Sequence, residues 1–146
     1  MIRDLPESEQ RALVVAEAVS WLRTPYHHAA RVKGAGVDCA QILIAVYSGV
    51  GLINDFQPAD YPPDWMLHRS EERYLGNVMQ HARQVDVPKP GDIAVWKFGR
   101  CFSHGAIVLD WPCVIHAYRP DQMVSYGDGT QGELAGREVT FWSLWE

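Results

Sequence analysis

The stretch GVDCAQILIAVYSGVG, residues 36–51, places Cys39 directly after Asp38, where a glycine-bearing loop gives way to an apolar segment. Aspartate is a common helix cap, so Cys39 is expected in the first turn of a helix. There, unpaired backbone N–H groups and the positive end of the helix dipole favour the thiolate over the thiol. Most cysteines simply pack in a core. At this position, however, a cysteine can act as a nucleophile if a base lies nearby.

Two histidines are candidates for that base. His104 begins HGAIVLD and His116 lies in CVIHAYR, which we interpret as the two strands of one hairpin. An odd-length turn, for example residues 109–111, would place both histidines on the same face, opposite or diagonal to each other, so that one imidazole could orient the other. An even-length turn would place them on opposite faces, and a β-bulge would change the parity again. Each histidine alone is more typical of a structural residue, but the combination predicts a cysteine–histidine site.

A zinc site is the competing interpretation of the same residues. Cys101 and Cys113 each precede a histidine by three positions, which gives C-x-x-H twice. Residues three apart in a strand point to opposite faces, so Cys113 and His116 cannot share a site within an unbroken strand. Cys101 is less constrained if it lies in the loop before its strand. We therefore expect no metal and no cofactor.

The elements that would position these side chains divide the chain into two halves. Helices are predicted over residues 4–22, 39–48 and about 64–82, and the second is apolar almost all round, as expected for a helix inside the domain. In the first helix, Asp4 with Glu7 resembles an N-cap pattern. Its apolar residues at helical spacing are Ala12, Val15, Ala16, Val19 and Leu22.

The second half carries short segments typical of antiparallel strands, separated by turn residues: residues 91–98, 103–110, 112–119, 122–128 and 139–145. Helices followed by strands indicate an α+β domain with the helices packed on one side of the sheet. The whole chain, residues 1–146, is expected to be one domain.

Composition limits the class of partner. The chain has 13 Lys and Arg against 18 Asp and Glu, a net charge of −5, so no basic field is available for a nucleic-acid backbone. Asp4, Glu7 and Glu9 stand where a secretory signal would be basic, and no segment approaches the length of a membrane span. We expect a protein made in the cytoplasm, without a signal peptide or membrane insertion.

The ordered motifs resemble one known family. Cys39, His104 in SHGAIVL and His116 in VIHA follow one another, with TPYHH ahead of the cysteine and PGDIAVW ahead of the first histidine. This order is similar to that of the NlpC/P60 family of papain-like cysteine peptidases, over roughly residues 10–120. The runs PYHH, VKG, VDC and WP resemble the short forms encoded by phage tail modules and gene transfer agents. DCAQ replaces the common DCSG, and PYHHAA the usual PYxxGG, without removing a catalytic group.

The resemblance implies a papain-like NlpC/P60 fold and hydrolysis of peptidoglycan stem peptides, typically between γ-D-glutamate and a diamino acid. By this similarity Cys39 would be the nucleophile, His104 the general base and His116 the residue that orients it. The backbone N–H of Cys39 and the hydroxyl of Tyr26 would hold the oxyanion. Asp38 is grouped with Tyr26 as a residue on the substrate and oxyanion side of the site. Its role is expected to be that of a helix cap and not that of a catalytic acid.

One alternative belongs to another class. The chain could be a structural or assembly protein of a phage tail that keeps the peptidase fold without its activity. The intact Cys/His/His set favours an enzyme. Expected partners are peptidoglycan stem peptides, together with phage-tail or gene-transfer-agent proteins that would carry the chain on a virion.

Overall fold

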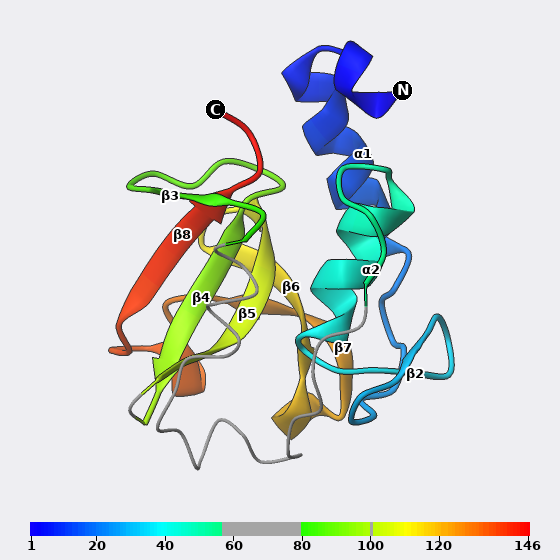
Figure 1. The fold of residues 1–146 in the computed structure, drawn as a ribbon. Coiled ribbons are helices and arrows are strands. Elements are labelled where there is room, and N and C mark those ends of the chain that lie inside the picture. Colours follow the sequence, from blue (N-terminus) through cyan, green and yellow to red (C-terminus); the bar gives the residue numbers. More distant parts are fainter. Residues whose placement is uncertain (57–79, 100) are drawn as a thin grey trace.

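A computed structural model describes residues 1–56, 80–99 and 101–146 of the chain. In Figure 1, the helices α1 (Glu7–Val19) and α2 (Gln41–Gly49) lie together on one side of a six-stranded antiparallel sheet. Both helices contact strand β5 (Cys101–Asp110), which lies inside the sheet. The predicted α+β class, with N-terminal helices packed on an antiparallel sheet, is confirmed.

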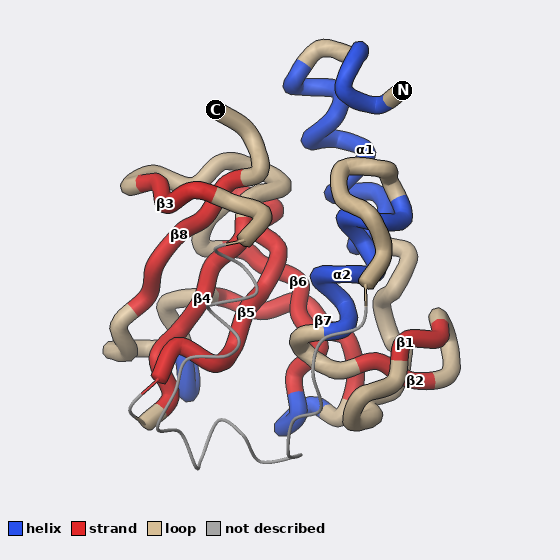
Figure 2. Tube along the Cα trace, viewed as in Figure 1, coloured by secondary structure: helices blue, strands red, loops and turns tan. Residues whose placement is uncertain are grey.

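The large sheet has the strand order β3-β8-β4-β5-β6-β7. Besides β5, its strands are β3 (Arg83–Val85), β4 (Ile93–Phe98), β6 (Cys113–Tyr118), β7 (Met123–Asp128) and β8 (Val139–Ser143). A small hairpin, visible beside β7 in Figure 2, is formed by β1 (Arg31–Val32) and β2 (Gly36–Val37). Short 3-10 helices are η1 (Ile2–Asp4), η2 (Arg119–Asp121) and η3 (Gly132–Leu134). The five predicted strand segments are confirmed, whereas β3 was not anticipated.

Helix α1 is shorter than the predicted helix over residues 4–22. It begins at Glu7 because Pro6 disfavours helical backbone at Leu5, and Asp4 belongs to η1 instead of capping α1. The expected helix at residues 64–82 lies almost wholly outside the described residues. Among the described residues, no helix combines the length and apolar character needed to cross a bilayer.

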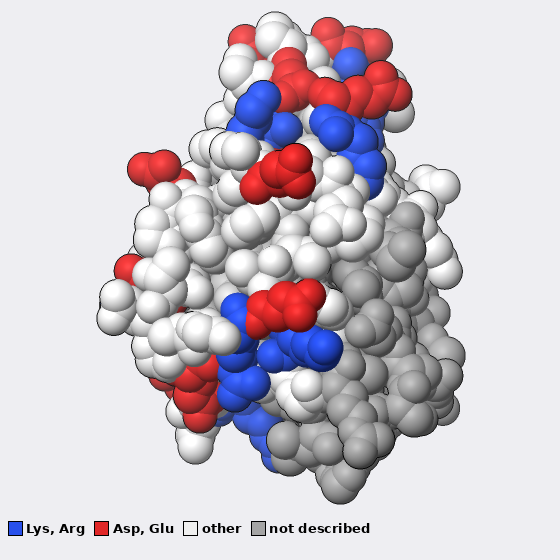
Figure 3. Space-filling view, turned by 90° about the vertical axis from the view of Figure 1, so that its left-hand side faces the viewer, with Lys and Arg blue, Asp and Glu red and all other residues white. Residues whose placement is uncertain are grey.

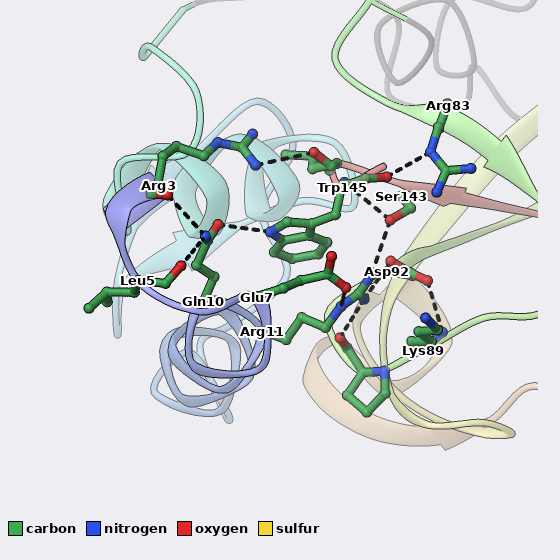
Figure 4. A network of polar contacts seen from close by, with 12 residues as sticks. Arg3, Leu5, Glu7, Gln10, Arg11, Arg83, Lys89, Asp92, Ser143 and Trp145 are labelled. Atoms are coloured by element: carbon green, nitrogen blue, oxygen red, sulfur yellow. Dashed lines mark hydrogen bonds and ion pairs between the residues drawn. The ribbon is translucent and has the colours of Figure 1, made fainter. Parts of the chain in front are cut away.

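The buried side of α1 is polar at its first turns. Arg11 Nη1 donates to Asp92 Oδ1 at 2.8 Å, and its guanidinium lies 4.2 Å from the centre of the Trp145 ring (Figure 4). Trp145 Nε1 in turn donates to Gln10 Oε1 at 2.9 Å. This network fastens α1 to the start of β4 and to the end of the chain.

The network also determines which side of α1 faces inward. Ala12 and Ala16, taken from the apolar spacing, are exposed. The buried residues of the helix are Gln10, Arg11, Val14 and Ala18. A buried ion pair draws Arg11 into the protein, so the helix is rotated away from the orientation that its alanines suggested.

Helix α2 is buried along most of its length, as predicted. Every residue from Gln41 to Tyr47 is buried, and the helix contributes to the apolar core between the helices and the sheet. A second apolar cluster, which includes Trp96 and Phe98, lies on other strand positions and is joined by residues 134, 139 and 141 from the C-terminal part. The sheet is therefore covered with apolar side chains on both faces.

Charge on the surface is mixed. Figure 3 shows acidic and basic side chains grouped near the top of that view and again below its middle, with a broad area free of charged side chains between the two groups. On this face, neither group is of a single sign.

Candidate active site

The Asp38 side chain caps the turn that leads into α2, as predicted, but the helix itself begins at Gln41, two residues after the predicted start at Cys39. Asp38 Oδ1 accepts hydrogen bonds from the backbone N–H groups of Ala40 at 3.1 Å and Gln41 at 2.8 Å. Its Oδ2 accepts from the backbone N–H of Ala29 at 2.7 Å. The Asp38 side chain is only 2% exposed. Both carboxylate oxygens therefore hold backbone in place, which suits a cap better than an acid that delivers protons.

Cys39 lies directly after this cap, in the turn that leads into α2, and is 1% exposed. Its Sγ is 4.0 Å from the backbone carbonyl oxygen of Ser103, the residue before His104. Peptide geometry then places the sulfur within about 6 Å of the His104 backbone nitrogen. The thiol lies against the segment of β5 that carries the candidate base.

His104 and His116 form a hydrogen-bonded pair. His104 Nε2 lies 2.9 Å from His116 Nδ1, and the two residues are 2% and 1% exposed. A neighbouring nitrogen at this distance fixes the orientation of each ring. The two histidines are therefore in contact, which is one of the two outcomes that the sequence left open.

The turn that brings the two histidines together differs from the odd-length turn over residues 109–111 that served as the example above. The turn between β5 and β6 is Trp111-Pro112, an even-length turn that alone would put the histidines on opposite faces. A register shift between Val108 and Asp110 adds one residue to β5 and restores the parity. The same-face placement therefore depends on a β-bulge at Leu109.

Aromatic rings surround His104. The centres of the Trp96, Phe98 and Tyr118 rings lie 5.9, 5.7 and 5.5 Å from the centre of its ring. Its Nε2 is committed to His116. Within the part of the chain that the structure describes, no hydrogen bond occupies its Nδ1, so this nitrogen can take up a proton.

Burial controls the protonation of the pair. The pKa of His104 is well below its ordinary value, first because of burial and then because of His116 and Arg137. Burial lowers the pKa of His116 to about 4, against an opposing effect of Asp121. Both rings are therefore neutral at pH 7, and a neutral His104 can act as a base.

Tyr26 lies near both Cys39 and His104. Burial, the neighbouring Cys39 and Asp38, and a hydrogen bond with Cys39 raise its pKa, while Arg119 opposes the increase. The hydroxyl therefore stays protonated and can donate. Tyr26 also lines a pocket of about 230 Å³. The other lining residues are Phe98, His104, Ala117, Tyr118, Arg119, Pro120 and Glu133.

The exposure of Cys113 and His116 agrees with the argument from strand parity that they cannot share a zinc site. Cys113 is exposed, whereas His116 is buried, although both belong to β6. The two side chains therefore do not meet. The arrangement of Cys113 and His116 in β6 therefore does not support a zinc site.

Two features around the histidines were missed from the sequence. Tyr118 stacks on His116 with ring centres 4.5 Å apart and an interplanar angle of 8°. A Cβ added at Gly127 would lie 2.8 Å from His116 Nε2, so the ring occupies the space that a side chain there would need. The alternation of β6 could have placed Tyr118 on the face of His116, but the close approach of Gly127 depends on the β6–β7 pairing.

Comparison with known proteins gives agreement at the level of the fold. No protein-family model and no curated protein matches the sequence. Solved structures do match. The peptidoglycan hydrolase RipB from Mycobacterium tuberculosis has a TM-score of 0.68 and 18% identity over 99% of this chain and 71% of its own.

Two further solved structures are similar. The NlpC/P60 domain of the peptidoglycan hydrolase SagA has a TM-score of 0.57 and 23% identity, covering 89% of this chain and 96% of its own. A lipoprotein-like protein of the NLP/P60 family from Staphylococcus aureus has a TM-score of 0.66 and 17% identity, with coverage of 92% and 42%. With its helices on one side of an antiparallel sheet and these neighbours, the chain has the NlpC/P60 fold.

Proposed function

We propose that the chain is a cysteine peptidase that hydrolyses peptide bonds in peptidoglycan stem peptides. The observation that carries the proposal is the arrangement of Cys39 at a capped helix start against the Ser103 carbonyl, one residue from the hydrogen-bonded His104–His116 pair. The peptidoglycan hydrolases among the structural neighbours support the class of substrate. The bond between γ-D-glutamate and a diamino acid is the proposed point of cleavage, by the resemblance of the motifs.

The first half of the reaction forms an acyl-enzyme. The Cys39 thiol transfers its proton to His104 Nδ1, and the sulfur attacks the carbonyl carbon of the scissile amide. The resulting oxyanion accepts hydrogen bonds from the Cys39 backbone N–H and the Tyr26 hydroxyl, whose raised pKa keeps it protonated. As the tetrahedral intermediate collapses, His104 protonates the nitrogen of the leaving amine, the C–N bond breaks and a thioester remains.

The second half releases the acid. Neutral His104 takes a proton from water, the hydroxide attacks the thioester carbon, and the thiol leaves with the proton returned from His104. His116 holds the His104 ring through the 2.9 Å contact at Nε2, so Nδ1 keeps its direction through both halves. Asp38 takes no proton in this scheme, because its carboxylate holds the turn that presents Cys39.

The proposal is tested by digestion of defined muropeptides, with the new termini identified by mass spectrometry. Wild type is expected to release fragments with a new amine on the diamino acid. Cys39→Ala removes the nucleophile and should release none. Cys113→Ala is the matched control, because this exposed thiol lies on β6 and takes no part in the scheme.

Absence of any cleavage by folded wild-type protein would contradict the proposal. It would favour the structural role in a phage tail, in which the fold is kept without the activity. Equal cleavage by Cys39→Ala would reject the nucleophile while leaving the substrate class in place.

A further inference from the structure

The Tyr118 ring contacts both histidines of the site. It stacks on His116 with ring centres 4.5 Å apart, and its centre is 5.5 Å from that of His104 at an angle of 53°. The hydroxyl at the far end of the ring donates a hydrogen bond to Glu133 Oε2 at 2.8 Å. Tyr118 therefore connects the histidine pair to a carboxylate that neither histidine contacts in the structure.

Glu133 is held in place by its own surroundings. It lies in η3, within the connection from β7 to β8, next to the buried Leu134. Arg137 Nε donates to the Glu133 backbone carbonyl at 2.5 Å, and the Arg137 guanidinium lies 3.9 Å from the centre of the Phe98 ring. Arg137 thus holds the backbone of this connection beside the Phe98 ring, and the exposed Glu133 carboxylate reaches the Tyr118 hydroxyl from there.

The proposed reaction needs a protonated His104, and burial opposes this protonation. His104 must carry a positive charge between the two proton transfers, but burial lowers its pKa and that of His116. An electron-rich ring face attracts a cation, and a carboxylate on the ring hydroxyl adds negative charge at its far end. The Tyr118 ring presents its face to His116, so a charge shared along the histidine pair would meet it.

We propose that Tyr118 and Glu133 are positioning residues, which act through His116 to hold the His104 ring in its working orientation and to favour its protonated form. This inference rests on the proposed peptidase function. Neither residue is assigned a bond-making step. Glu133 acts through Tyr118, by holding the ring and by placing negative charge at its hydroxyl.

Other charges face the histidine pair and must stay constant in a test. Asp121 raises the pKa of His116, and Arg137 lowers that of His104. Both residues are retained in every variant below. Their effects are therefore common to all the proteins compared.

Three variants separate the contributions of the Tyr118 ring, its hydrogen bond to Glu133 and the Glu133 charge. Tyr118→Phe keeps the ring and removes the hydrogen bond to Glu133, Tyr118→Leu removes the ring as well, and Glu133→Gln keeps an acceptor oxygen without its charge. Tyr126→Leu is the matched control, because Tyr126 is an exposed tyrosine on β7. The assay is cleavage of a defined muropeptide as a function of pH, with kcat and KM measured separately.

We expect kcat to fall about tenfold or more in Tyr118→Leu and several-fold in Tyr118→Phe, with a smaller effect in Glu133→Gln. The acid limb of kcat should move to lower pH in Tyr118→Leu, since the protonated pair loses its ring partner. Tyr126→Leu should behave as wild type. A kcat within twofold of wild type in Tyr118→Leu, or a change in KM alone, would overturn the inference.

A second readout separates this inference from the proposed function. Histidine-ring 15N NMR reports tautomer and protonation without substrate. In wild type, one nitrogen of each ring should show the His104–His116 hydrogen bond, and this signature should be weakened in Tyr118→Leu and retained in Tyr118→Phe. Unchanged spectra in Tyr118→Leu would reject the positioning role even if the protein cleaves muropeptides. Altered spectra in a protein that cleaves nothing would reject only the proposed function. If Tyr118→Leu does not fold, Tyr118→Phe decides by the same kcat criterion.

Discussion

Acid should destabilise the folded chain through His116. The folded-state pKa of this residue is about 4, against an ordinary value of 6.5, because the ring is buried. Between pH 6.5 and about pH 4, the unfolded chain therefore binds a proton at His116 that the folded chain does not bind. The contribution of the neutral ring to stability is fully present above about pH 6.5 and is lost as the pH falls toward 4.

The magnitude follows from the two pKa values. The difference between 6.5 and about 4 corresponds to about 3 kcal/mol of unfolding free energy once the pH is below 4. Between pH 7 and pH 5 the loss should be about 2 kcal/mol. At 1% exposure, the His116 side chain is little screened by solvent, so this value needs no large reduction.

Urea denaturation at pH 7 and pH 5 measures this loss. In His116→Gln the side chain keeps a hydrogen-bonding group but cannot titrate, so the variant should lose about 2 kcal/mol less than wild type between the two pH values. His27→Gln removes an exposed histidine and should keep the wild-type pH dependence. The same pH dependence in wild type and His116→Gln would refute the reasoning, since it would mean that His116 is not buried in its neutral form.

Three further substitutions have expected outcomes. Gly127→Ala places a Cβ where His116 Nε2 lies, 2.8 Å away, so the ring should move off its partner and kcat should fall about tenfold; an unchanged kcat would show that the ring position does not matter. Asp38→Ala removes the cap and should cost about 1–2 kcal/mol in urea denaturation, and a loss below 0.5 kcal/mol would contradict the capping role. Asp92→Asn removes the buried partner of the Arg11 guanidinium and leaves it paired only with the more exposed Glu7, which should cost about 3 kcal/mol, whereas unchanged stability would show that the Arg11–Asp92 pair contributes little.

The sequence predicted the parts of the fold that depend on local pattern. The cap at Asp38 and the strands around His104 and His116 each follow from a few neighbouring residues, and the structure confirms them. The start of α1 was also within reach, because Pro6 lies in the sequence where the helix begins.

What the sequence could not supply depends on contacts between distant segments. The inward face of α1 follows from the pair that Arg11 forms with Asp92, 81 residues away. The bulge at Leu109 decides whether the two histidines share a face, and the spacing of residues alone allowed either result. The approach of Glu133 to Tyr118 follows from the course of the β7–β8 connection, for which the turn-like sequence gives no direction.

Competitive alkylation tests the central claim, that His104 activates the Cys39 thiol, most directly. Iodoacetamide is added to the folded protein at pH 7, and the rates at Cys39 and Cys113 are read by peptide mass spectrometry in wild type and in His104→Ala. Exposure alone would favour Cys113, since Cys39 is 1% exposed. An activated nucleophile should nevertheless react first at Cys39 in wild type, and slow to below Cys113 in His104→Ala. Faster labelling of Cys113 in wild type, or a Cys39 rate that does not change when His104 is removed, would contradict the account.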